Sequence, residues 1–89
     1  MRSKNKPAPT VAEREHIERL KEIGGCILCG GEPVEIHEPK QGLWFASMPL
    51  CSVCHRHPKW GIPSQGLNWK AKKWDEWDAI NATIARLFA

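Results

Sequence analysis

Cys51-Ser52-Val53-Cys54-His55-Arg56-His57 is the stretch that decides the fold of this 89-residue chain. Its two cysteines are separated by two residues, and the same spacing occurs at Cys26 and Cys29, with 21 residues (30–50) between the two pairs. Two C-x2-C turns joined by about 15–20 residues are typical of a closed tetrahedral zinc site. We therefore expect Cys26, Cys29, Cys51 and Cys54 to bind one structural zinc ion. Two disulfides are the alternative.

The length and composition of the chain favour one small folded domain. Hydrophobic residues make up 42% of the 89 residues, and a core of this size commonly needs a structural metal to support it. We expect a flexible basic arm over residues 1–9 and a single domain over residues 10–89. Neither a signal peptide nor an apolar run of membrane-spanning length is recognisable. A cytoplasmic protein is therefore expected, in a reducing compartment where paired cysteines usually bind metal.

Local signals predict an N-terminal helix and a β-hairpin. Thr10 and Glu13 have the spacing of a capping box that opens a helix, and Gly24-Gly25 is a suitable end for it. His16 falls on the polar side of this helix, where we expect a surface histidine. After the first C-x2-C turn, residues 34–37 and 43–46 are expected to form two strands that flank a turn at residues 39–42.

The second C-x2-C turn is expected to open a short helix, because Pro58 discourages the helical conformation at the residue before it. A long final helix is expected over residues 69–88, capped by Asn68. Its buried stripe would consist of apolar residues at three- and four-residue spacings, namely Trp74, Trp77, Ile80, Ile84, Leu87 and Phe88. Together these elements predict a small zinc-stapled α+β domain with a helix at each end of the chain.

The distribution of charge is more informative than the net charge of +3. Residues 39–74 contain no Asp or Glu. We expect the basic residues of this acid-free block to bind nucleic-acid phosphates. They are Lys40, Arg56, Lys59, Lys70, Lys72 and Lys73. The alternative is an ordinary solvated surface.

Histidines lie between the two cysteine pairs, at His37, and directly after the second pair, at His55 and His57. Together with the cysteines they resemble a known family. Val34-Glu-Ile-His37-Glu38, a turn, and then Met48-Pro-Leu-Cys51-Ser-Val-Cys54-His55 resemble the zinc-stabilised form of the HNH (ββα-metal) endonuclease superfamily. The sequence of this segment most resembles small phage HNH proteins related to the recombination-enhancing nuclease Ref. The resemblance covers residues 26–60 and implies a treble-clef fold.

The resemblance also implies catalytic residues. His37 matches the family's ligand for a catalytic Mg²⁺ or Mn²⁺ ion, and Glu38 matches the position of its general base. A histidine after the second cysteine pair supplies a further ligand, for which His57 is preferred over His55. This sequence departs from the family pattern in two respects. Glu38 stands where a histidine is usual, and no Asn lies between His37 and Cys51 to orient the base.

The resemblance implies a phage- or prophage-encoded endonuclease that hydrolyses DNA phosphodiester bonds with one divalent metal, and we expect no membrane association. Two other classes of function stay open. One is a catalytically degenerate zinc module that binds DNA without cutting it. The other is a protein-interaction adaptor that uses exposed Trp44, Trp60 and Trp69.

Overall fold

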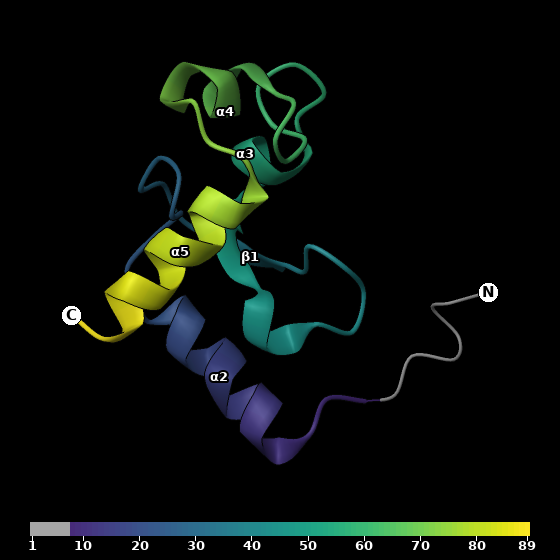
Figure 1. The fold of residues 1–89 in the computed structure, drawn as a ribbon, viewed down its shortest axis with the longest axis vertical. Helices are drawn as coiled ribbons and strands as arrows, with labels where there is room; N and C mark the ends of the chain where they lie inside the picture. Colours follow the sequence, from purple (N-terminus) through teal and green to yellow (C-terminus); the bar gives the residue numbers. More distant parts are fainter. Residues whose placement is uncertain (1–7) are drawn as a thin grey trace.

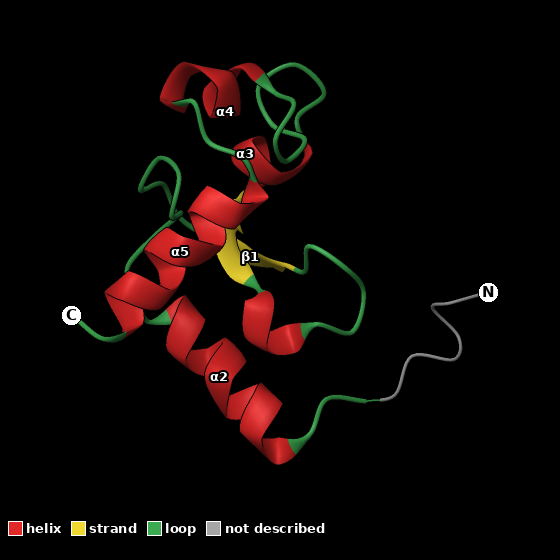
Figure 2. Cartoon of the chain, viewed as in Figure 1, coloured by secondary structure: helices red, strands yellow, loops and turns green. Residues whose placement is uncertain are grey.

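A two-stranded antiparallel sheet lies at the centre of the molecule. In the computed structural model, which describes residues 8–89, β1 (Val34–His37) pairs with β2 (Met48–Cys51). Val34 lies opposite Cys51 and His37 lies opposite Met48. Helices pack around this hairpin (Figures 1 and 2), which confirms the expected α+β class. Of the arm expected over residues 1–9, residues 1–7 lie outside the described part of the chain.

The returning strand lies further along the chain than the sequence predicts. Residues 43–46 were expected to form it, but they hold Leu43 and the short 3-10 helix η1 (Trp44–Ala46). Burial explains the difference, since Leu43 and Phe45 are 48% and 55% exposed whereas both Met48 and Leu50 of β2 are fully buried. The strand expected over residues 43–46 is therefore wrong, and β2 leads directly into the second C-x2-C turn.

The N-terminal helix α2 (Val11–Lys21) begins as predicted. The Glu13 amide donates to the Thr10 hydroxyl over 3.1 Å, and the Thr10 amide donates to the Glu13 carboxylate over 2.7 Å. This reciprocal pair confirms the capping box. Gly24 and Gly25, after the helix, have φ values of +104° and +129°, which side chains other than glycine rarely adopt.

His16, expected on the surface of this helix, is half-buried. Its ring lies 5.2 Å from that of Phe45, which belongs to η1. The Nε2 atom is buried without a hydrogen-bond partner. Burial, reinforced by the charge of Arg19, lowers the pKa of His16. The packing of η1 against α2 therefore leaves His16 half-buried, with one ring nitrogen enclosed.

The C-terminal region forms two helices where one was expected. Helix α4 (Leu67–Lys72) has Gly66 and not Asn68 as its N-cap residue. Its C-cap residue is Lys73, which has a left-handed φ of 61°. Helix α5 (Glu76–Leu87) then starts at a second capping box, in which Asp75 and Asp78 each bond the other's backbone amide. The Asp75 side chain thus satisfies free N–H groups at a new helix start, and the prediction of one helix over residues 69–88 is wrong.

The break changes which face of the last helix is buried. Ala79 and Thr83 are its buried residues, whereas Trp77 is 79% exposed and Phe88 is 85% exposed. Ile84 is also exposed. Trp74 and Ile80 of the predicted stripe do pack against the core, so the stripe has the right period and its phase is wrong only in part. A shift by one residue turns a helix face by about 100°.

The bulky core residue supplied by this region is Trp69 of α4, which is fully buried. It packs in one cluster with one cysteine of each C-x2-C turn and with four other residues, namely Cys26, Cys54, Leu28, Met48, Leu50 and Ala79. Between β2 and α4 lie the short helix α3 (Ser52–Arg56), which ends before Pro58 as expected, and an irregular loop. No helix within residues 8–89 is both long enough and apolar enough to cross a bilayer.

Candidate functional site

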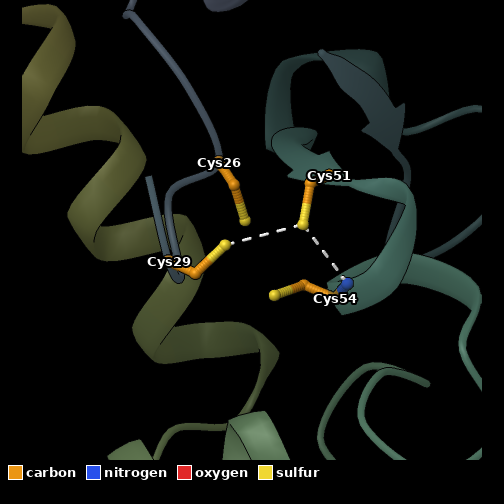
Figure 3. Close-up of side chains that lie close together, drawn as sticks. All are labelled: Cys26, Cys29, Cys51 and Cys54. Atoms are coloured by element: carbon orange, nitrogen blue, oxygen red, sulfur yellow. Dashed lines mark hydrogen bonds between the residues drawn. The ribbon is translucent and has the colours of Figure 1, made fainter. Parts of the chain in front are cut away.

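The four cysteines converge, as their spacing predicts. Cys26 and Cys29 lie on the turn that follows α2, while Cys51 ends β2 and Cys54 belongs to α3. All four Sγ atoms lie within 4.8 Å of one another (Figure 3). The four are free thiols, and the sulfur atoms of Cys29 and Cys51 are 3.5 Å apart. A disulfide bond would bring them to about 2.05 Å.

Backbone amides surround these sulfur atoms. The amides of Leu28, Gly31 and Cys54 donate to the Sγ atoms of Cys26, Cys29 and Cys51, each over 3.4 Å. Asn68 donates to the remaining sulfur, that of Cys54, through its side-chain amide over 3.5 Å. Such donors stabilise thiolates, and second-shell contacts of this kind orient the ligands of a metal.

A cation would stabilise the four cysteines as thiolates. Burial raises the pKa of the Cys54 thiol, and burial likewise raises the pKa of Cys29. Four thiolates so close together repel one another unless a positive charge lies among them. The quartet could therefore hold a metal such as zinc, which prefers four sulfur ligands in tetrahedral geometry.

Two histidines meet beside the hairpin. His37 ends β1 and His55 lies in α3, and their rings are 4.9 Å apart between centroids. Nδ1 of His37 lies 3.2 Å from Nε2 of His55. The sequence left two candidates for the partner of His37, namely His57 and His55. The residue that lies beside His37 is His55.

The outer nitrogen of each ring contacts a carboxylate. Nε2 of His37 lies 2.5 Å from Oε2 of Glu76, at the start of α5. Nδ1 of His55 lies 2.7 Å from Oε1 of Glu35, whose other oxygen is 2.5 Å from the Arg56 guanidinium. The hydrogen bond from His55, together with the charge of Arg56, lowers the pKa of Glu35 against the opposing effect of burial. The result is one chain of polar contacts from Glu76 to Arg56.

This chain has a consequence for the protons on the two rings. A carboxylate accepts a hydrogen bond, so each outer nitrogen carries the ring proton when the imidazole is neutral. Both inner nitrogens, Nδ1 of His37 and Nε2 of His55, are then lone-pair acceptors that face each other across 3.2 Å. A shared proton or a metal cation between them relieves that repulsion. The arrangement matches the carboxylate–histidine–metal pattern of metalloproteins.

Sequence reasoning missed Glu35 and Glu76. A signal for Glu35 was present, because residues i and i+2 of a strand point to the same face and Glu35 precedes His37 by two. Glu76 offered no such signal, since it lies 39 residues from His37 along the chain.

The other expected site residues take different positions. Nδ1 of His57 accepts hydrogen bonds from the amides of Lys59 and Trp60, over 3.1 and 3.2 Å. His57 therefore organises the turn after α3. One carboxylate oxygen of Glu38 accepts from the Gly42 amide over 2.8 Å, within the hairpin loop.

The expected phosphate-binding residues are all exposed, namely Lys40, Arg56, Lys59, Lys70, Lys72 and Lys73. Arg56 is paired with Glu35, and the Nζ atoms of Lys59 and Lys72 lie 4.9 and 4.8 Å from the ring centroids of Trp60 and Trp74. Of the tryptophans considered for an adaptor surface, Trp60 is 40% exposed and Trp69 is buried.

The two clusters differ in what they can do chemically. Among residues 8–89, the cysteine quartet alone brings three or more metal-binding side chains within 4.8 Å of one another. It is a closed site that suits a structural ion. The histidine pair supplies two nitrogens, which would leave coordination positions of a metal open to water or to a substrate oxygen. Comparison of the chain with protein-family models, with curated proteins and with solved structures gives no match.

Proposed function

We propose that this protein is an HNH-type endonuclease that hydrolyses DNA phosphodiester bonds with one divalent metal, Mg²⁺ or Mn²⁺, held by His37 and His55. The four cysteines bind a structural zinc ion that stabilises a treble-clef fold. The observation that carries the proposal is the pair of inner ring nitrogens, which lie 3.2 Å apart while Glu76 and Glu35 occupy the outer nitrogens.

The separation of the ring nitrogens fits two ligands of one ion. Metal–nitrogen bonds of about 2.0–2.1 Å in tetrahedral or octahedral geometry place two ligand nitrogens about 3.0–3.4 Å apart. Glu76 and Glu35 would fix the ring orientations and increase the basicity of the inner nitrogens. A divalent ion bound here would polarise the scissile phosphate and stabilise the leaving oxygen. The exposed basic residues of the acid-free block would position the DNA backbone.

A specific observation also favours a second candidate, a zinc module that binds DNA without cleaving it. Glu38 is the residue proposed to accept a proton from the attacking water, yet one of its oxygens is bonded to the Gly42 amide. No Asn lies between His37 and Cys51 to orient a base. A carboxylate is moreover a weaker base than neutral imidazole near neutral pH.

A plasmid-nicking assay separates the two candidates. Supercoiled DNA is incubated with the zinc-loaded protein in Mg²⁺ or Mn²⁺, and nicked circles are quantified. We expect His37→Ala and His55→Ala each to abolish nicking while zinc content and circular dichroism stay unchanged. His57→Ala, a matched control in the same segment, should retain cleavage if the fold persists.

The position of Glu38 is tested in the same assay. Glu38→His restores the pair of histidines usual in the family, and we expect it to raise the nicking rate. A protein that binds DNA, shows no cleavage with any divalent metal and gains none from Glu38→His would be the non-cleaving module.

A further inference from the structure

We propose that a pocket beside His37 binds one unpaired nucleobase of the DNA strand that is cut. This inference rests on the proposed nuclease function and names the form of its substrate. The pocket has a volume of about 310 Å³ and lies between the hairpin loop and the first turns of α5. Its principal lining residues are Pro39, Lys40, Leu43, Glu76, Trp77 and Ile80.

The pocket shares a wall with the histidine cluster. Glu76 lines it, and the Oε2 atom of the same side chain lies 2.5 Å from Nε2 of His37. Lys40, three residues after His37, lies on the loop side of the pocket and is exposed. A group held in this pocket is therefore one side chain away from the ring proposed to bind the catalytic metal.

Trp77 is the residue that points to an aromatic ligand. Helix α5 buries Ala79 and Thr83 against the rest of the molecule, so Trp77, at 79% exposed, contributes little to the core. An indole with a free face is a platform on which a base can stack, and Leu43 and Ile80 supply apolar walls. The carboxylate of Glu76 is engaged by Nε2 of His37.

Lys40 supplies the positive charge that a nucleotide in this pocket would need. Lys40 belongs to the block of residues 39–74 that lacks Asp and Glu, so its ammonium can contact the phosphate attached to a base held among the apolar walls. The volume is at the small end of the ligand-pocket range, roughly 300–1,000 Å³, which suits one base. A base inside a duplex is stacked on both faces and cannot enter. The preferred substrate is therefore single-stranded DNA or an unpaired nucleotide next to the cleaved bond.

The test combines a protein variant with a DNA variant. Fluorescence polarisation measures binding of the zinc-loaded protein to a single-stranded oligonucleotide and to its duplex, without added Mg²⁺ or Mn²⁺. We expect the wild type to prefer the single strand, and Trp77→Ala to weaken that binding roughly tenfold because base stacking is removed. Trp77→Phe should keep most of the affinity. Phe88→Ala is the matched control, because Phe88 is an equally exposed aromatic residue at the far end of α5 and does not line the pocket.

An abasic site moved along the oligonucleotide identifies the bound base. At one position it should weaken wild-type binding about as much as Trp77→Ala does, and it should weaken the variant little further, because the two changes remove the same stacking interaction. In Mn²⁺, that position should adjoin the cleaved bond.

The outcomes separate this inference from the proposed function. Cleavage that is equally fast for wild type and Trp77→Ala on single-stranded DNA would leave the nuclease standing and overturn the base pocket. Coupling between Trp77 and one base in a protein that never cleaves DNA would support the pocket and overturn the nuclease. Equal losses from Trp77→Ala and Phe88→Ala, accompanied by loss of self-association, would assign the helix face to a protein contact instead.

Discussion

The indole Nε1 of Trp69 donates a hydrogen bond to the backbone carbonyl of Cys54 over 2.9 Å, and both side chains are fully buried. This bond joins α4 to the cysteine quartet. The largest core side chain and one of the proposed zinc ligands therefore belong to the same packed unit, so that loss of either should loosen the other.

The different burial of two tryptophans predicts different effects on stability. Trp69→Ala should lower the free energy of unfolding by about 3–5 kcal/mol, because it leaves a cavity and an unsatisfied carbonyl. Trp77→Ala should change it by less than about 0.5 kcal/mol, since Trp77 is 79% exposed. Urea unfolding of the zinc-loaded proteins measures both values. Comparable losses in the two variants would contradict the assignment of Trp69 as the core residue.

Removal of metal should unfold the domain. We expect a strong chelator to abolish most of the helical circular dichroism signal and added zinc to restore it, since metal binding in such small domains is coupled to folding. Elemental analysis should find one zinc per chain, and Cys54→Ser should reduce zinc binding. Retention of the folded spectrum after all zinc has gone would contradict a structural metal.

His16 should make the stability depend on pH. Because burial lowers its pKa below the ordinary value of 6.5, the unfolded chain binds more protons than the folded one as the pH falls below 6.5. Its contribution to stability is complete above that pH and is progressively lost below it, until the folded pKa is passed. The loss is at most about 1.4 kcal/mol per pH unit.

His16→Gln removes this contribution. Urea unfolding of wild type and variant between pH 5 and 8 should show that the wild type loses more stability on acidification. The cysteine quartet titrates in both proteins, so the difference between the two curves isolates His16. Parallel curves would show that His16 is as readily protonated in the folded chain as in the unfolded one.

The carboxylates behind the histidines should tune metal affinity. Glu35→Gln weakens the acceptor of the His55 ring proton, so the Mn²⁺ concentration required for half-maximal nicking should rise about 10–100-fold. Glu15→Gln, an exposed change on α2, is the control. An unchanged Mn²⁺ requirement in Glu35→Gln, with zinc content intact, would show that Glu35 does not support the metal.

The basic cluster of Lys70, Lys72 and Lys73 should govern the salt dependence of DNA binding. Replacing all three by Gln should reduce the slope of log affinity against log salt, by roughly 0.7 for each phosphate of a single strand that is no longer neutralised. Lys21→Gln, in which the removed ammonium pairs with Glu18 on α2, should leave the slope unchanged. Binding that does not respond to salt in the wild type would indicate a protein-interaction surface instead.

The features determined by sequence alone are those stabilised by neighbouring residues. The Thr10–Glu13 capping box spans one helical turn, and the strand at residues 34–37 follows from a short alternating pattern. The convergence of the four cysteines was also predictable from their spacing, because two C-x2-C turns favour one shared metal ion wherever the chain can bring them together.

Tertiary structure decided the features that depend on distant contacts. The break before α5 follows from a local cap at Asp75, but its consequence, the burial of Ala79 and Thr83 in place of Trp77, depends on how the helix docks. The choice of His55 beside His37 depends on how α3 packs against β1, because the strand register pairs Cys51, just before α3, with Val34 at the other end of β1 from His37. Glu76 reaches the same ring across 39 residues. Periodicity shows that a helix has a buried face, whereas the packing of the whole chain selects that face and the side chains that meet there.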